Sequence, residues 1–263
     1  MSTSSLERAV ITARKNAVRK LVSERLKTVT HESIVDQSHI IADTVRSLPE
    51  YHLAKNIGLY MHMEVARSIP RKSGRSVEVR TDTLIKSAFE DGKTVYLPRI
   101  VPATDLSPHL QQLFHEAQSH LHNCQEALFT PSAFLKMLKM KDHDSVELLT
   151  TTNEDHDFII REPDADCEDT LDGDGLDLII VPGLVFNEMC NRVGRGKGFY
   201  DNYIELHRAW SQTANKPSPL LVGIALQEQM YDTDLDQHLP REEHDQILDI
   251  LVVGDVIYRR GVH

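Results

Sequence analysis

The sequence predicts an α/β fold in which helices cover both faces of a mostly parallel sheet, giving three α/β/α layers. Five short runs of apolar residues predict strands at 56–61, 94–98, 176–183, 220–226 and 248–254. These runs do not alternate between apolar and polar residues, which is typical of strands that are buried on both faces. Helical patterns lie between them, and this succession of elements favours parallel pairing.

Helices are indicated where apolar residues recur every three or four positions. The first predicted helix covers residues 6–26, with apolar positions at Ala9, Val10, Ala13, Ala17, Leu21 and Val22. A second covers 34–48 and ends before a proline, and a third covers 82–93 with an aspartate near its start and a glycine near its end. A fourth begins near Phe199, between two of the strands.

The chain of 263 residues, 40% of them hydrophobic, is long enough for one sizeable core. We expect a single domain over residues 1–263 with two insertions. Residues 65–77 are polar and predict a loop, and residues 104–146 are rich in His, Gln and Ser and predict an insertion or surface subdomain. The acidic stretch 162–174 lacks the glycine and the closing glutamate of a calcium loop, so we interpret it as a solvated linker.

Charge and cysteine content narrow the functional classes. With 40 acidic and 29 basic residues the formal net charge is −11, which argues against nucleic-acid or anionic-membrane partners. The three cysteines have no CxxC spacing, so a reducing compartment is favoured over disulfides or a zinc site. We expect a soluble cytoplasmic monomer that acts on small molecules. A basic N-terminal segment leaves a mitochondrial leader open as the alternative.

The most unusual stretch is NRVGRGKGFYDNYI, residues 191–204, which concentrates positive charge in an acidic chain. Cations and glycines are interleaved within it, at Arg192, Gly194, Arg195, Gly196, Lys197 and Gly198. Glycine lets backbone N–H groups approach a ligand closely, while arginine and lysine bind phosphate oxygens. The helix that follows would direct its N-terminal N–H groups at the same anion. The stretch therefore predicts a phosphate site, with a basic surface turn as the alternative.

Two aspartates are candidate metal ligands. Asp201 follows the cations, where a carboxylate would oppose anion binding unless it held a divalent metal that bridges the phosphates. The alternative is an ordinary first-turn aspartate that interacts with the helix dipole. Asp245 precedes the last predicted strand, and ligands collect at strand ends in open parallel sheets. Glu242, Glu243 and Asp249 compete for the same role.

Residues 177–204 resemble the signature of the 5-formyltetrahydrofolate cyclo-ligase family. The order is a strand, Pro-Gly-Leu-x-Phe, Asn-Arg, Gly-Arg-Gly-Lys-Gly and then an aromatic residue, Tyr and Asp. The resemblance extends over nearly the whole chain outside the predicted insertions, through segments 15–26, 60–63, 92–99 and 242–252. It implies that the three-layer fold is of the kind found in NagB, RpiA and CoA transferases.

The resemblance also implies an activity, the ATP- and Mg²⁺-dependent closure of 5-formyltetrahydrofolate to 5,10-methenyltetrahydrofolate with release of ADP and phosphate. A formamide oxygen is a poor leaving group. Its phosphorylation gives an N5-iminium phosphate, from which N10 can displace phosphate. The protein must chiefly position the γ-phosphate and stabilise its charge, as is usual in phosphoryl transfer.

By matching positions, the resemblance implies that Lys15 and Arg19, which share a helix face, bind the ATP phosphates. It implies a nucleotide cradle formed by Arg192, Val193, Gly194, Arg195, Gly196, Lys197, Gly198, Phe199 and Tyr200. Within this cradle, Arg195 and Lys197 would act nearest to the transferred phosphoryl group. Asp201 and Asp245 would hold Mg²⁺.

The implied substrate site consists of Met61, a glutamate and the loop residues Arg195, Gly196, Lys197, Gly198 and Phe199. The glutamate is ambiguous, and Glu78 matches the family context better than Glu64 does. The family usually has Tyr where Phe199 stands, so a hydroxyl contact would be lost. Without the resemblance, the residues also allow structural roles. Met61 could belong to the core, and Lys15 and Arg19 could lie on a solvated helix face.

Two other functional classes stay open. A sugar-phosphate isomerase or CoA transferase could use a similar sheet without ATP, but neither explains Asp201 and Asp245 as a metal pair. An RNA-binding module would need a broad basic face with interleaved aromatic residues, against which the excess of acidic residues argues.

Overall fold

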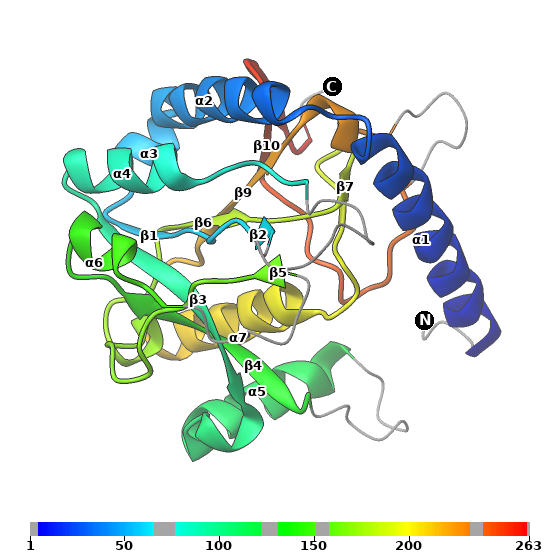
Figure 1. Ribbon diagram of the computed structural model, residues 1–263. Helices are drawn as coiled ribbons and strands as arrows, with labels where there is room; N and C mark the ends of the chain where they lie inside the picture. The colour runs from blue at the N-terminus through cyan, green and yellow to red at the C-terminus, as the bar shows by residue number, and fades with distance from the viewer. Residues whose placement is uncertain (1–4, 66–76, 122–130, 151–157, 232–238, 262–263) are drawn as a thin grey trace.

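The computed structural model describes the chain apart from residues 1–4, 66–76, 122–130, 151–157, 232–238 and 262–263 (Figure 1). Its centre is a seven-stranded sheet. The strand order is β11 (Val256–Arg259), β10 (Ile250–Val253), β9 (Leu220–Ala225), β6 (Leu178–Val181), β1 (Asn56–Gly58), β3 (Thr94–Pro102) and β4 (Ala133–Lys139). Strands β10 to β3 pair in parallel, and each edge strand is antiparallel to its neighbour. The predicted mostly parallel α/β sheet is confirmed.

Helices and short strand pairs complete the described part of the chain. The helices are α1 (Ser5–Leu26), α2 (His31–Ser47), α3 (Pro49–Leu53), α4 (Asp82–Glu90), α5 (Pro108–Leu121), α6 (His143–Glu147) and α7 (Phe199–Thr213). Single 3-10 turns form η1 (Ala103–Asp105), η2 (Thr170–Asp172) and η3 (Gln227–Gln229). Two small antiparallel pairs join β2 (Glu64–Val65) to β5 (Phe158–Ile159) and β7 (Val185–Phe186) to β8 (Arg192–Val193).

The sheet separates two hydrophobic cores, which makes the fold three-layered (Figure 1). Along β6, Leu178 and Ile180 belong to the core shared with α1, α2 and α4, and the intervening Ile179 belongs to the core shared with α5 and α7. Every residue of β6 is buried, because helices cover both faces. This double burial explains why the apolar strand runs show no alternation with polar residues.

Helix α2 shows how local sequence sets an element. The hydroxyl oxygen of Thr30 accepts a hydrogen bond from the backbone N–H of Ser33 at 3.1 Å and caps the start of the helix. Ile34, Ile41 and Val45 recur at helical spacing and are buried against the sheet. A proline follows directly after the C-cap residue and begins α3. The predicted helix over 34–48 is confirmed within a few residues.

Helix α1 is oriented differently from what its apolar residues suggest. Val10 and Leu21, which helped to predict the helix, are 52% and 51% exposed. The buried face instead carries Lys15, Val18 and Val22. A lysine on the buried side of an amphipathic helix needs a charged partner there, and this partner proves to be part of the candidate site.

The stretch 104–146 contributes to the main sheet as well as carrying a surface helix. Strand β4, which the sequence analysis did not predict, pairs with β3 from Tyr96↔Lys139 to Pro102↔Ala133. Its sequence, AFLKMLK, is rich in good helix formers, and pairing with β3 overrides that propensity. Helix α5 packs beside α7 on the same side of the sheet. Whether 104–146 and 65–77 are insertions relative to the family stays a prediction, and 66–76 lie outside the described residues.

The interpretation of 162–174 as a solvated linker is wrong for its key acidic side chains. Glu162 and Asp169 are only 7% and 5% exposed. Glu162 Oε1 accepts the backbone N–H of Ile100 at 3.1 Å, and Asp169 Oδ1 accepts that of Leu171 at 3.2 Å. Burial raises the pKa of Asp169, while Lys136 Nζ lies 3.5 Å from its other oxygen. These carboxylates are tolerated in the interior because both accept a backbone hydrogen bond and Asp169 also lies near a lysine. Sequence composition does not reveal such contacts.

His207 provides a test of this packing through the pH dependence of stability. Its buried ring accepts the backbone N–H of Leu176 at Nε2 (2.9 Å), and burial lowers its pKa from 6.5 to about 4. Between these values the unfolded chain binds more protons than the folded one, so stability falls as the pH is lowered. We expect this group to remove up to about 3 kcal/mol from the free energy of unfolding between pH 6.5 and pH 4.

The measurement is urea denaturation of the wild type and of His207→Gln across this pH range. The glutamine is neutral throughout and keeps an acceptor, so its stability should depend less steeply on pH. Parallel pH profiles in the two proteins would contradict the assignment.

Candidate functional site

The glycine-cation loop, defined as residues 194–198, lies between β8 and α7. Gly196 and Gly198 have φ angles of +95° and +69°, in the left-handed region that disfavours residues with a Cβ atom. Gly198 directly precedes α7, so this conformation sets the direction in which the helix begins. The free N–H groups of the first turn of α7 therefore adjoin the loop cations, as the sequence predicts.

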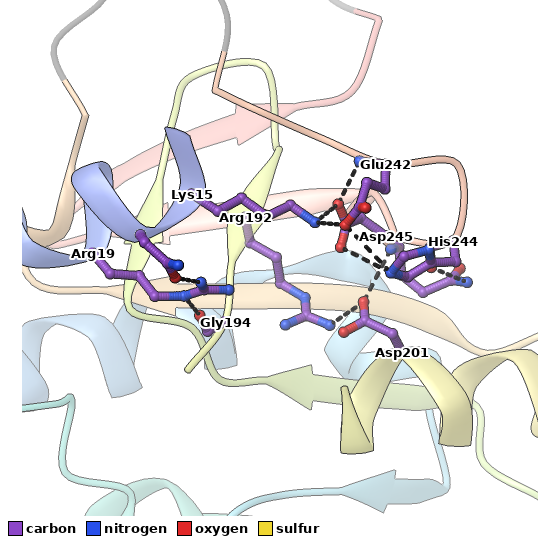
Figure 2. Close-up of polar contacts among 10 residues, drawn as sticks. Lys15, Arg19, Arg192, Gly194, Asp201, Glu242, His244 and Asp245 are labelled. Carbon is purple, nitrogen blue, oxygen red and sulfur yellow. Dashed lines mark hydrogen bonds and ion pairs between the residues drawn. The ribbon is translucent and has the colours of Figure 1, made fainter. Parts of the chain in front are cut away.

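Arg19 ties helix α1 to this loop. Its Nε donates a hydrogen bond to the carbonyl oxygen of Gly194 at 2.8 Å, and its Nη1 donates to Asn16 Oδ1 at 2.7 Å (Figure 2). A Cβ atom added to Gly196 would lie 3.5 Å from the guanidinium group. Arg19, a predicted phosphate ligand, is thus in direct contact with the predicted nucleotide cradle, although the two are far apart in the sequence.

Lys15 lies one turn before Arg19 and extends into a cluster of acidic side chains (Figure 2). Its Nζ is 2.5 Å from Asp245 Oδ2 and 2.7 Å from Glu242 Oε2, and its side chain is only 8% exposed. His244 Nε2 lies 3.7 Å from Glu242 Oε2 and 3.9 Å from Asp245 Oδ1. Within the described part of the chain, Glu242, His244 and Asp245 are a group whose ligand atoms all lie within 4.8 Å of one another and could hold a metal ion.

Asp201, the other predicted metal ligand, lies in the first turn of α7 and is paired with a buried arginine. Arg192 Nη2 donates to Asp201 Oδ1 at 2.6 Å, and the backbone N–H of Gln246 donates to the same oxygen at 3.0 Å. The side chain of Gln246 also bonds α7 through Glu205 Oε2 at 3.2 Å. Gln246 therefore fixes the segment that carries Asp245 alongside α7, the helix that carries Asp201 (Figure 2).

Glu78 lies beside the glycine-cation loop, where it faces Arg195. Its Oε1 is 3.5 Å from Arg195 Nη2, and its side chain is 9% exposed while that of Arg195 is 42% exposed. Burial raises the pKa values of Tyr60 and Tyr200, and the nearby charge of Glu78 is the next cause for both. The hydroxyl oxygen of Tyr200 is buried and has no hydrogen-bond partner among the described residues.

The structure brings together most of the predicted site residues. Met61 follows Tyr60 beyond the end of β1 and is 5% exposed within the core, so its contact with a ligand stays a prediction. Lys197 is exposed at the tip of the loop, and no ion-pair partner for it exists among the described residues. Phe199 is half-buried at the start of α7 and packs on the core beneath. The side chain of Glu64 lies outside the described part of the structure.

Three residues of this region were not predicted to be part of the site. Glu242 was named only as a competitor of Asp245, and His244 was not considered, although the Glu-x-His-Asp spacing carries suitable ligand atoms. Gln246 fixes the acidic segment against α7 by hydrogen bonds that no sequence pattern indicates.

Comparison with known proteins identifies the family. A sequence model described as the 5-formyltetrahydrofolate cyclo-ligase family matches residues 11–254. The chain belongs to this family. Among its curated relatives, the probable 5-formyltetrahydrofolate cyclo-ligase of Schizosaccharomyces pombe is 30% identical over 94% of this chain and 98% of the relative. The 5-formyltetrahydrofolate cyclo-ligase of Saccharomyces cerevisiae is 28% identical over 92% and 96%.

Solved structures show that this cyclo-ligase family member shares its fold with two bacterial proteins. The Aquifex aeolicus 5,10-methenyltetrahydrofolate synthetase superposes with a TM-score of 0.58 at 22% identity, covering 95% of this chain and 94% of the other. The Mycoplasma pneumoniae 5,10-methenyltetrahydrofolate synthetase gives a TM-score of 0.50 at 17% identity, covering 92% and 99%. Among the described residues, no helix is long and apolar enough to cross a membrane.

A pair of glycine substitutions tests whether the glycine-cation loop binds phosphate oxygens. Gly198→Ala and Gly254→Ala both place a Cβ atom at positive φ, +69° and +61°, without a close contact. Both should lower the free energy of unfolding by about 1 kcal/mol through backbone strain. Only Gly198→Ala should also weaken the binding of inorganic tripolyphosphate, because its loop would move. Calorimetric titration compares the two variants, and equal affinities would argue against the loop as the anion site.

Proposed function

We propose that this protein closes 5-formyltetrahydrofolate to 5,10-methenyltetrahydrofolate, using ATP as the phosphoryl donor and Mg²⁺, with ADP and phosphate as products. The observation that carries this proposal is the convergence of α1, the glycine-cation loop and the acidic segment at one site. Membership of the family and relatives named 5-formyltetrahydrofolate cyclo-ligase support it.

The proposed reaction transfers one oxygen from the formyl group to phosphate. The formyl oxygen attacks the γ-phosphorus of ATP, and the bond from that phosphorus to the ADP oxygen breaks. The product is an N5-iminium phosphate, whose carbon is attacked by N10. Collapse of the adduct expels phosphate with the former formyl oxygen, and N10 loses its proton. The protein's task is to align the reactants and stabilise charge on the transferred group.

Arg195 and Lys197 are the residues proposed to act on the transferred phosphoryl group. Both lie on the loop, are exposed to an incoming ligand, and carry the positive charge that the phosphoryl oxygens need. Arg195 also lies 3.5 Å from Glu78, so the phosphoryl side and the pterin side of the site meet at this residue. The other phosphates would be bound by Lys15, Arg19 and the remaining cradle residues. The cradle residues would contribute mainly backbone N–H groups.

Glu78 is proposed to accept hydrogen bonds from N–H groups of the pterin ring. Its carboxylate lies among Tyr60, Tyr200 and Arg195, in a largely buried setting where such bonds are strong. Phe199 supplies an aromatic face and Met61 an apolar contact. The buried hydroxyl of Tyr200 is a further donor close to this position.

Asp201 and Asp245 fit a site for Mg²⁺ because this ion prefers carboxylate oxygens. Each already lies against a cation, Arg192 at 2.6 Å and Lys15 at 2.5 Å, so both occupy positions where positive charge is stabilised. Glu242 adds a carboxylate close to that of Asp245. When bound, Mg²⁺ would neutralise charge on the phosphate oxygens.

We further propose that the chain acts as a cytoplasmic monomer with one domain over residues 1–263, with mitochondrial residence as the alternative.

The direct test is the absorbance of 5,10-methenyltetrahydrofolate formed from 5-formyltetrahydrofolate by the purified protein. Product should form only when ATP and Mg²⁺ are both present, with one ADP released for each product molecule. Omission of either should abolish turnover, because the formyl oxygen then has no route to become a leaving group. Product formation at the same rate without nucleotide would rule out the proposed function.

Lys197→Ala tests the proposed role of the loop cation. Loss of an ammonium that acts on the transferred phosphoryl group should lower kcat by about 100-fold or more, since groups that stabilise developing charge typically contribute this much. The fold should be unaffected, because Lys197 is exposed. Lys20→Ala removes an exposed lysine of α1 and serves as the control. Equal kcat in both variants, measured by the same absorbance, would exclude Lys197 from the chemistry.

A further inference from the structure

Lys15 is bound by the carboxylates that the proposed function assigns to the metal. Its ammonium group lies within 2.7 Å of both Glu242 and Asp245, and these two side chains are each 17% exposed. Two carboxylates this close in a half-buried site repel each other unless a cation lies between them. Lys15 therefore supplies the positive charge that a divalent ion would otherwise provide.

The second metal aspartate is arranged in the same way. Asp201 is paired with Arg192, whose side chain is only 4% exposed. Lys15 and Arg192 are both proposed phosphate ligands, and each is engaged by a proposed metal ligand. Two of the three donors of the Lys15 ammonium already face carboxylates, so a metal that binds these acids and phosphates that bind this ammonium both compete with the existing ion pairs.

We infer that Lys15 neutralises Glu242 and Asp245 until nucleotide and metal arrive together, when its ammonium passes to the phosphates and Mg²⁺ takes its place between the acids. This inference rests on the proposed function and adds a specific exchange of partners to it. Lys15 therefore couples two binding events. Glu242 takes part as the acid that holds Lys15 beside Asp245.

The exchange has a thermodynamic consequence for the order of binding. Metal alone must displace a buried ammonium whose ion-pair partners within the described chain are these two carboxylates. Nucleotide alone must withdraw that ammonium and leave the two carboxylates without it. Each ligand removes the obstacle to the other, so metal and nucleotide should raise each other's affinity by the same factor.

The first experiment measures Mn²⁺ binding to the full chain by calorimetry and by electron paramagnetic resonance, without nucleotide. Lys15→Met keeps the apolar stem and removes the charge, so this variant should bind Mn²⁺ about tenfold or more tightly than the wild type, a typical size for such coupling. Lys20→Met, which removes an exposed charge from the same helix, should bind as the wild type does. Equal or weaker Mn²⁺ binding by Lys15→Met would overturn the inference.

A second pair of variants keeps the test decisive if Lys15→Met does not fold. Glu242→Gln leaves Lys15 with one carboxylate, so a non-hydrolysable ATP analogue should bind more tightly than to the wild type in the absence of metal. Glu243→Gln removes the same charge from the exposed neighbouring position and should leave this affinity near that of the wild type. Unchanged or weaker nucleotide binding by Glu242→Gln would also overturn the inference.

The same titrations separate failure of the inference from failure of the proposed function. If the wild-type protein binds the ATP analogue with Mg²⁺ but substitution of Lys15 leaves the Mn²⁺ affinity unchanged, the proposed function stands and the exchange is rejected. A wild-type protein that binds no nucleotide even with Mg²⁺ would reject both.

Discussion

The docking of helix α1 through two adjacent cations is the interaction on which the site depends. Lys15 reaches the acidic segment before β10, and Arg19 bonds the carbonyl of Gly194 in the glycine-cation loop. Val18 and Val22 anchor the same helix by packing into the core. Without α1, the hydrogen bond from Gln246 to Asp201 would still hold the acidic segment against α7, but Glu242 and Asp245 would lack a shared cation.

The sheet explains why groups from such distant parts of the chain meet. Parallel strands place their carboxyl ends at one edge, and the chain beyond β1 leads to Tyr60 and Met61 while the chain beyond β6 leads through β7 and β8 to the loop. Glu78 lies near this edge because the hydroxyl of Tyr60 donates to the carbonyl oxygen of Val79. A sheet buried on both faces gives these loops a rigid base.

Sequence reasoning succeeded where chemistry and spacing are local. The loop cations and glycines are adjacent in the chain, so the sequence itself shows that they lie together. The strands are apolar throughout because both of their faces are buried, so they too could be predicted. It failed where tertiary contacts decide the outcome. The helix-forming residues of β4 are paired as a strand, and the buried face of α1 carries Lys15 while apolar Leu21 lies outside. That Lys15 would lie between Glu242 and Asp245 depends on contacts between the two ends of the chain.

The large sequence separation between Lys15 and its acidic partners affects when the site can assemble during synthesis and folding. Lys15 and Glu242 are 227 positions apart, so the ribosome must synthesise the chain as far as Glu242 before their ion pair can close. Such distant contacts have a high entropic cost and tend to form late in folding. Nascent chains that stop short of Glu242 would thus expose a basic loop without its acidic counterpart, and the site would be complete only once Glu242 had reached Lys15.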